Sequence, residues 1–461
     1  MADELNIPTH RWYEPRNHIA LPKEDVSKQW IFDSGIQKID AFINAQPWGN
    51  PIVPLFALNE PGVWYDPSDL TTMFQDRAGT TPVTAPGQTV GYVLDKSGRG
   101  NHLTANSDAA RGLYGIEPLG GRRNLLTYTE QFDNAAWGKT TATVTANAAV
   151  APNGTTTADE VEFTSGVGGF ASIATFVTVT AATHTQTIYV KAFPGQEGNT
   201  VTFDNSGATG TVTITLTSDW QRVSKPVIAS AGVLGVRVIS YPGNTASRFY
   251  VWGAQLELGS TATDYQRVVT ALEVTEAGKP SLPYILFDGA DDGYVTPTIT
   301  PGTDKAQVFA GVRKLSDAAL AMLFETSTNA GSLNGAIYFL APHSNGQGTY
   351  QIQSKGTATG VTATSPNSYP APITSVLTGT SDIAGDLVTL RINGAQIAQA
   401  TGDQGTGNYL AYPLYVGRRG GTTLPFNGRL YSLIVRFGPN LDAARISEVE
   451  RFVAGKTGVT L

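Results

Sequence analysis

The feature that most constrains this chain is a strict alternation of threonines with apolar residues. In residues 209–217, TGTVTITLT, single threonines separate a valine, an isoleucine and a leucine. Successive side chains of a strand point to opposite faces, so this pattern predicts a half-buried strand with one face in solvent. THTQTIYVKAF (183–193) and SRFYVWGAQLELG (247–259) repeat the theme with aromatic residues. We therefore expect an antiparallel jelly roll or Greek-key sandwich over residues 123–267.

A second β-rich region runs from Tyr284 to the C-terminus. In residues 387–397, LVTLRINGAQI, the pair Asn393-Gly394 separates two alternating segments. Both residues readily adopt positive φ, so this pair predicts a tight hairpin turn.

Residues 441–458, LDAARISEVERFVAGKTG, form the clearest helical pattern in the chain. Asp442 lies near the predicted start, and Gly455 is the candidate C-cap. One face of the predicted helix is apolar and carries Ile446, Val449 and Val453. We expect a short C-terminal helix packed on a β-sandwich.

The composition excludes several classes of protein. The formal net charge is −7, and no basic run is interleaved with aromatic residues, so nucleic-acid binding is not expected. The absence of cysteine excludes disulfides, a thiolate nucleophile and a sulfur-based zinc site, and it favours synthesis in a reducing cytoplasm. No apolar run is long enough to span a bilayer, and the N-terminus lacks a signal-peptide core. We expect a soluble protein that is made inside a cell and does not insert into a membrane.

Residues 1–60 differ from the rest of the chain. They contain an apolar pattern interrupted at Ser34-Gly35 and an aromatic set that comprises Trp12, Tyr13, Trp30 and Trp48. A segment this small buries few of its own side chains. It is either a cap on the next domain or a docking segment that buries its aromatic residues against another subunit.

The C-terminal region carries a family resemblance. The order strand, Asn-Gly, strand, LYVGRR, FNGRLYSLIVRF and then a helix ending ERFVAGKTGV resembles the concanavalin A-like, laminin-G-type jelly roll. In particular, it resembles the version found in structural proteins of tailed bacteriophages. The first part of that domain resembles residues 64–102 here, and its next strand resembles ILFDGADDGYV, residues 285–295.

The segment between these two parts resembles a second domain. NLLTYTEQFDNAAWGK (124–139) and FYVWGAQLELGSTATDYQRV (249–268) are similar to the two ends of a carbohydrate-binding-module-like domain of phage virion proteins. The resemblances imply an all-β protein with two antiparallel β-sandwiches, one inserted in the other. The implied parts are an N-terminal docking segment 1–60, a split concanavalin A-like sandwich 61–122 and 268–461, and an inserted jelly roll 123–267.

GYVLDKSGRGNHLT, residues 91–104, holds Asp95 and His102 on a glycine-rich turn. An acid/base or metal pair is one interpretation of this turn. We favour the other, in which Asp95 and Asn101 accept hydrogen bonds from turn amides and His102 leads into a strand.

Catalysis is not expected. Glycosidases of the concanavalin A-like class show a paired acidic motif along one strand, whereas Glu257 and Glu325 each stand without such a partner in the sequence. Carboxylates distant in sequence could still converge, so a polysaccharide depolymerase stays an alternative.

FDGADDGYV places three carboxylates on a tight turn: Asp288, Asp291 and Asp292. Hard oxygen ligands are what Ca²⁺ requires, although the spacing is not that of an EF-hand. The default expectation is solvated turn carboxylates without a cofactor, with calcium as the alternative.

Sugar binding requires aromatic faces for stacking and planar polar groups for hydroxyls. The candidates on the C-terminal sandwich are Tyr409, Tyr412, Arg418 and Arg419. The candidates on the inserted sandwich are Trp137 and Trp220.

The resemblances imply a tailed-phage virion protein. We expect a tail fibre or receptor-binding protein that attaches to a host surface glycan, synthesised in the host cytoplasm and located on the tail or head surface. A homotrimer that docks on other virion proteins through residues 1–60 is the expected assembly. A capsid-attached head fibre or decoration protein is the structural alternative.

Overall fold

The computed structural model describes residues 50–164, 168–205, 210–343 and 346–461. The chain divides into two compact units, residues 1–58 and 59–461. The described part of the first unit contains the 3-10 turn η2 (Val53–Phe56). The predicted docking segment falls mostly outside the described residues, as do its aromatic residues Trp12, Tyr13, Trp30 and Trp48.

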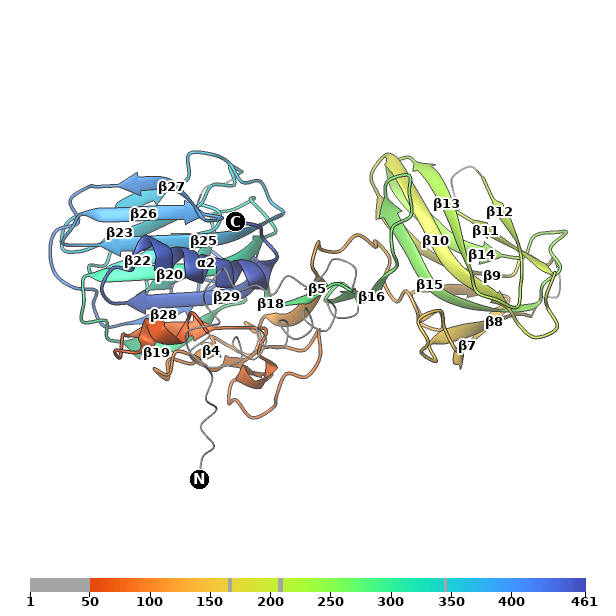
Figure 1. Cartoon of the computed structure of the whole chain (residues 1–461), viewed down its shortest axis with the longest axis horizontal. Helices are drawn as coiled ribbons and strands as arrows, with labels where there is room; N and C mark the ends of the chain where they lie inside the picture. The colour runs from red at the N-terminus through yellow and green to blue at the C-terminus, as the bar shows by residue number, and fades with distance from the viewer. Residues whose placement is uncertain (1–49, 165–167, 206–209, 344–345) are drawn as a thin grey trace, which may run out of the picture. The chain divides into compact units, whose positions relative to one another are not determined.

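The second unit consists of four β-sheets and, among the described residues, one α-helix near the C-terminus (Figure 1). This arrangement confirms the all-β fold class. The pairings between described strands are antiparallel, with the exception of β17 (Glu273–Glu276), which runs parallel to β5 (Leu113–Pro118).

Two of these sheets, A and B, form the larger sandwich. Sheet A runs, in order of pairing, β16 (Gln266–Thr270), β17, β5, β18 (Ser281–Asp288), β29 (Asn427–Phe437), β20 (Lys305–Lys314), β25 (Ile373–Asp382), β26 (Leu387–Ile392) and β27 (Ala395–Ala400), with β1 (Gly62–Tyr65) also paired to β29. Sheet B runs, in order of pairing, β2 (Met73–Phe74), β3 (Tyr92–Val93), β4 (Leu103–Ala105), β19 (Tyr294–Ile299), β28 (Tyr412–Val416), β21 (Met322–Thr326), β22 (Ala336–Leu340), β23 (Gln351–Lys355) and β24 (Val361–Thr364). The 3-10 turn η3 (Leu70–Thr72) directly precedes β2 in the chain.

The other two sheets, C and D, form the inserted sandwich, whose strands lie in sequence between β5 and β16 of sheet A. Sheet C runs β12 (Val212–Thr215), β11 (Thr200–Asp204), β14 (Gly232–Ile239), β9 (Ser172–Val179) and β6 (Gly138–Thr140). Sheet D runs β13 (Gln221–Ala229), β10 (Ala182–Ala192), β15 (Arg248–Leu258), β8 (Ala158–Phe163) and β7 (Ala142–Ala149).

Each sandwich has its own hydrophobic core. The larger core joins the inner faces of sheets A and B through buried residues such as Val308, Leu433, Phe324 and Phe339. The inserted core joins sheets C and D through residues such as Phe203, Val236, Ile188 and Phe249. Burial of these apolar surfaces is the main driving force for packing the two sheets of each sandwich.

Local sequence signals produce the strands and turns that they predict. At β12, Ile214 and Leu216 are buried, while the neighbouring Thr213, Thr215 and Thr217 are exposed. Asn393 and Gly394 have φ angles of 49° and 79° and connect β26 to β27, as the hairpin signal predicts.

The helix α2 (Ala443–Thr457) packs against β20, β25 and β29 of sheet A (Figure 1). Asp442 is its N-cap, since its carboxylate accepts a hydrogen bond from the backbone N–H of Arg445 at 2.8 Å. The predicted C-cap is wrong: Gly455 lies inside the helix, and Gly458, with φ 72°, ends it. The helix ends about one turn later than the sequence predicts, because Val453 and Thr457 are buried and keep the helix in contact with the sheet.

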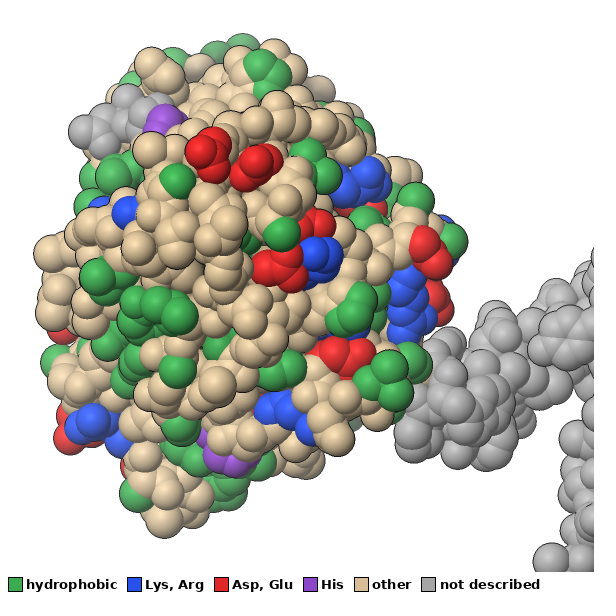
Figure 2. Space-filling view, turned by 90° about the vertical axis from the view of Figure 1, so that its left-hand side faces the viewer, with side chains coloured by type: hydrophobic (Ala, Val, Ile, Leu, Met, Phe, Trp, Pro, Cys, Tyr) green, Lys and Arg blue, Asp and Glu red, His purple; other side chains and the backbone are tan. Residues whose placement is uncertain are grey.

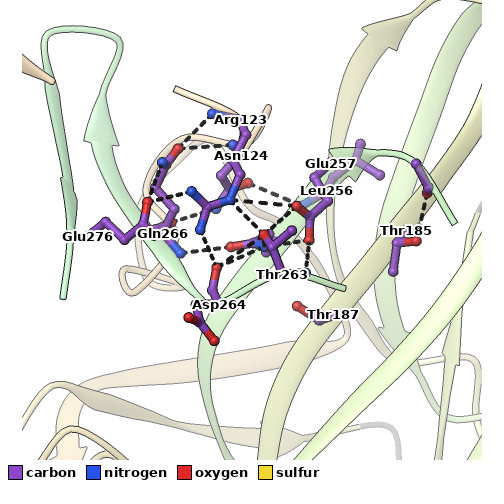
Figure 3. A network of polar contacts seen from close by, with 12 residues as sticks. Arg123, Asn124, Thr185, Thr187, Leu256, Glu257, Thr263, Asp264, Gln266 and Glu276 are labelled. Carbon is purple, nitrogen blue, oxygen red and sulfur yellow. Dashed lines mark hydrogen bonds and ion pairs between the residues drawn. The ribbon is translucent and has the colours of Figure 1, made fainter. Parts of the chain in front are cut away.

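A polar network joins the segment that enters the inserted sandwich to the segment that leaves it (Figure 3). The side-chain oxygen of Gln266 accepts hydrogen bonds from the backbone N–H groups of Arg123 and Asn124 at 2.8 and 3.2 Å. The Arg123 guanidinium pairs with Glu276 of β17 and donates to Thr263 at 2.6 Å. The insertion is therefore closed at its base by hydrogen bonds that centre on the buried side chain of Gln266.

None of the described helices is long and apolar enough to span a membrane. Figure 2 shows one face of the second unit, on which acidic and basic side chains are interspersed over a mostly uncharged surface. This face presents no extended single-sign patch.

The two helix glycines provide a test of the helix boundary. Gly455 is exposed with open space around it, so Gly455→Ala should stabilise the protein by about 1 kcal/mol through helix propensity. Gly458→Ala should destabilise it by about 1–2 kcal/mol, because its φ is left-handed and a Cβ would lie 2.5 Å from Leu119 Cδ1. Urea unfolding of both variants measures the difference. Destabilisation by Gly455→Ala would instead place the cap at Gly455.

Candidate functional site

Two of the aromatic residues predicted to bind sugar lie in hydrophobic cores. Tyr409 is 3% exposed, and its hydroxyl lies between the hydroxyls of Ser354 and Ser381. Burial raises the pKa of Tyr409 to about 12. Trp137 is 1% exposed and its Nε1 donates to the Tyr128 carbonyl at 3.0 Å. A ring without an open face cannot stack on a sugar, so the structure contradicts the prediction for Tyr409 and Trp137.

Tyr412 and Arg418 are half-buried and bonded to neighbouring loops. The Tyr412 hydroxyl donates to the Asn334 carbonyl at 3.2 Å. Arg418 donates to the carbonyl of Asp291 at 3.2 Å and to that of Thr422. Sugar binding by Tyr412 and Arg418 stays a prediction.

Arg419 is engaged by Glu325, which the sequence left without a partner. The Glu325 carboxylate accepts hydrogen bonds from the N–H groups of Gly420 at 2.7 Å and Ala330 at 3.2 Å, and it pairs with Arg419 Nε at 3.4 Å. Burial raises the pKa of Glu325. This carboxylate therefore holds two loops together over sheet B, and Arg419 is only partly free to meet a ligand.

Trp220 borders an aromatic cluster on the inserted sandwich. Its Nε1 donates to the Val150 carbonyl at 3.0 Å, and the half-buried ring packs in the same cluster as Trp252. The Trp252 ring lies 4.6 Å from Tyr265 and 5.4 Å from Tyr189, measured between ring centroids. The sequence prediction included Trp220 at the edge of this cluster, but not Trp252, Tyr265 and Tyr189 at its centre.

In the turn of residues 91–104, Asp95 and His102 have the structural roles that the favoured interpretation predicts, whereas the Asn101 side chain donates to the Gly62 carbonyl at 2.8 Å. The Asp95 carboxylate accepts hydrogen bonds from the backbone N–H groups of Trp64, Ser97 and Asn101, at 2.9, 2.9 and 3.1 Å. His102 Nδ1 accepts from the N–H of Asp95 at 2.9 Å, one residue before β4 begins. Asp95 and His102 thus shape the turn that leads into sheet B.

Asp288, Asp291 and Asp292 lie together, with one oxygen of each within 4.8 Å of the others. Asp292 is buried and accepts the backbone N–H of Asp288 at 2.8 Å, while the other two carboxylates are exposed. Burial, together with the charges of Asp288 and Asp291, raises the pKa of Asp292 to about 6. Three hard oxygen donors fit Ca²⁺, and these residues would hold it.

A polar pocket of about 330 Å³ lies at the base of the inserted sandwich. Its wall comes from three separate segments: the stretch that enters the sandwich, the edge formed by β7 and β8, and the start of β16. The side chains that give it chemistry are Glu130, Asp133, Asn147, Thr157, Asp159 and Arg267. This is a concave site with converging polar groups, more polar than the usual small-molecule site, whose lining is mostly apolar.

Asp159 holds two of these walls together. Its Oδ2 accepts the Phe132 N–H at 2.7 Å, and its Oδ1 accepts the Asn147 N–H at 2.9 Å. Asn147 has a φ of 54° at an irregularity in β7, where Thr145 and Ala149 pair out of step with β8. Burial raises the pKa of Asp159 to about 6, although both backbone hydrogen bonds oppose the rise.

Arg267 lies on the opposite wall between two carboxylates. Its Nη1 donates to Glu273 at 2.9 Å, and its Nε lies 3.4 Å from Glu130. Burial raises the pKa of Glu130 despite the nearby Arg267 charge. Thr157 connects the pocket to the aromatic cluster, because its hydroxyl accepts a hydrogen bond from Trp252 Nε1 at 3.0 Å.

The pocket is absent from the sequence predictions because residues 267–269 are separated by more than a hundred positions from its other lining residues, which lie within 128–159. TYTEQFDN and TDYQRV were recognised only as the ends of a domain. Both ends of an inserted domain must return to the host domain, and their convergence is the signal that could have indicated a site there.

No protein-family model and no curated protein matches the sequence. Among solved structures, the chain is similar to the sialidase module CBM40 of Ruminococcus gnavus, a structure in which that module is bound to α2,3-sialyllactose. The sequence identity is 16% and the TM-score is 0.27, and the match covers 32% of this chain and 83% of that chain. It is also similar to the heptameric SAP-like pentraxin of Limulus polyphemus, with 12% identity, 36% and 81% covered, and a TM-score of 0.30.

A third similar structure is the receptor-binding domain of botulinum neurotoxin mosaic serotype C/D, with 12% identity, 37% of this chain and 42% of that chain covered, and a TM-score of 0.29. Likenesses at these identities and TM-scores do not bear on what this chain binds.

The raised pKa of Asp292 predicts a dependence of stability on pH. The folded protein binds a proton at Asp292 between about pH 4 and 6 that the unfolded chain does not, so this residue's contribution to stability falls as pH rises through that window. Asparagine stays neutral at both pH values. The change in the free energy of unfolding caused by Asp292→Asn should therefore be more favourable at pH 7.5 than at pH 4.5, by roughly 1–3 kcal/mol. Thermal unfolding at both pH values measures this. An equal effect at the two would contradict it.

Calcium binding at the same turn predicts a separate effect. Millimolar Ca²⁺ at pH 7.5 should raise the melting temperature of the wild type, because a ligand that binds only the folded state stabilises it. Asp291→Asn should reduce that shift. An unchanged melting temperature would leave the three carboxylates as a solvated turn.

Proposed function

We propose that the protein is a bacteriophage virion component, a tail fibre or receptor-binding protein, that attaches to a host surface glycan through the pocket of its inserted sandwich. The observation that carries the glycan proposal is that pocket, with its polar lining and its aromatic neighbour cluster. The virion assignment rests on the resemblance of the C-terminal motifs and of the two ends of the insertion to phage proteins.

The size of the pocket supports a small ligand unit. A volume of about 330 Å³ lies at the lower end of small-molecule sites. Such a site suits a terminal sugar or a short branch better than the middle of a long chain. Weak binding at each copy of a homotrimer would add up through avidity.

The lining chemistry supports a polyhydroxylated ligand. Gln131, Asn147 and Thr157 offer amide and hydroxyl groups, and the exposed Asp133 offers a carboxylate acceptor. Tyr128 supplies an aromatic side chain at the same pocket. Hydrogen-bond groups beside an aromatic ring are the usual means of sugar recognition.

We propose binding without cleavage. The Asp159 carboxylate is occupied by two backbone N–H groups, and Glu130 is paired with Arg267. Neither carboxyl is thus positioned as a free acid and base across a bond. Incubation with host capsule or lipopolysaccharide that shortened the glycan chains would establish the depolymerase instead.

Binding to host cells tests the pocket. Gln131→Ala and Asp133→Ala should each weaken saturable binding about tenfold, which corresponds to about 1.4 kcal/mol. The matched control is Asp219→Ala, which changes an exposed acid of the same sandwich outside the pocket lining. A parallel Tyr412→Ala variant tests the larger sandwich. Loss of binding in Tyr412→Ala alone would move the receptor site there, and full binding by every variant would contradict the proposed site.

The place of the protein on the particle is tested by immunogold labelling of virions. Label at the tail supports the receptor-binding role, whereas label on the capsid would establish the head-fibre alternative. Deletion of residues 1–58 leaves Glu60, the ion-pair partner of Arg436 at 2.9 Å, in place. That variant should fold and fail to join particles. Its normal incorporation would contradict docking through the N-terminal segment.

A further inference from the structure

The charges around the pocket are unequal in sign. Three carboxylates, those of Glu130, Asp133 and Asp159, face one guanidinium, that of Arg267. Resting on the proposed function, we propose that the pocket selects a sugar unit that carries a protonated amine and rejects anionic sugars such as sialic and uronic acids.

The Arg267 guanidinium already has two acidic partners. Arg267 already lies within 2.9 Å of a Glu273 oxygen and 3.4 Å of a Glu130 oxygen. The Glu130 side chain is only 9% exposed, whereas that of Arg267 is 37% exposed, so the carboxylate of this pair is largely removed from water and the guanidinium is not. An incoming carboxylate would compete with both acidic partners, and displacing Glu130 would leave its buried carboxylate without the Arg267 charge.

Lys139, a second cation close to the pocket carboxylates, also has partners. Lys139 lies close enough to Asp133 and Asp159 to interact with both charges. Its ammonium donates to the backbone carbonyls of Asp133 and Asn134, at 2.6 and 2.7 Å. Lys139 therefore neutralises part of the negative charge, and two of its three ammonium N–H groups are already bonded to backbone carbonyls.

Asp133 is the carboxylate that a ligand can reach. Its residue is exposed, whereas Asp159 is 1% exposed and bonded at both oxygens. A protonated amine that meets Asp133 gains a charge-assisted hydrogen bond, the stronger kind. Gln131 and Thr157 remain for the hydroxyls of the same sugar.

A metal ion is a poorer occupant of this pocket. Among the described residues, the group of three acidic side chains that converges closely enough to hold an ion is the turn of Asp288, Asp291 and Asp292. The pocket carboxylates are spread over separate walls, an arrangement that suits an extended organic cation with several polar groups.

The test measures binding of the full chain to three oligosaccharides at pH 6.5: a glucosamine oligomer with free amines, the same oligomer N-acetylated, and sialyllactose. The amine-bearing oligomer should bind at least tenfold more tightly than its acetylated form, and sialyllactose should bind most weakly. Asp133→Asn should lower affinity for the amine-bearing oligomer five- to tenfold and leave the neutral oligomer within twofold. Asp219→Asn, the matched control, should change neither.

The outcomes separate this inference from the proposed function. If host-cell binding depends on the pocket but the glucosamine oligomer neither competes with it nor binds better than the other two, amine selectivity is overturned and glycan attachment stands. If neither the wild type nor any pocket variant binds host cells, the proposed function itself fails and the selectivity with it.

Discussion

The structure depends on the hydrogen-bond network that closes the base of the insertion. A domain placed between two strands of another sheet requires its two connecting segments to meet, and here Gln266 binds the N–H groups of both Arg123 and Asn124. Asn124 in turn donates to the carbonyls of Ala254 and Gln266, at 3.0 and 2.9 Å. Because the Asn124 and Gln266 side chains are fully buried, leaving either of them unpaired would carry the full cost of its desolvation.

The candidate pocket is a consequence of that closure. One wall belongs to the entering segment, beginning at Tyr128, and another to the leaving segment at Arg267, the residue after Gln266. The backbone N–H of Thr129 donates to the Val268 carbonyl at 3.0 Å, which fixes the register of the two segments. The groups that would meet a ligand are thus held by the same contacts that join the inserted sandwich to sheet A.

The candidate residues chosen from the sequence have two kinds of role in the structure: aromatic side chains pack in the cores, and a charged side chain forms an ion pair. Tyr409 and Trp137 contribute large apolar areas to cores and satisfy their polar atoms internally, so their signal is packing. Arg419 forms an ion pair with the buried carboxylate of Glu325, for which the sequence indicates no partner. The ion pair forms because β21, which carries Glu325, pairs with β28, after which Arg419 follows, and local patterns do not encode the pairing of two strands so far apart in sequence.

The sequence by itself determined what depends on neighbouring residues: the alternating strands, the Asn393-Gly394 hairpin, the Asp442 cap and the turn built on Asp95. Strand period, positive φ and side-chain capping are local properties, so a short stretch suffices to specify them. Only the tertiary structure decided that the helix ends at Gly458 rather than Gly455, that Tyr409 is buried, and that Glu130, Asp159 and Arg267 share a pocket. Each of these depends on which distant segment packs alongside, and burial and charge pairing act between residues that the sequence keeps far apart.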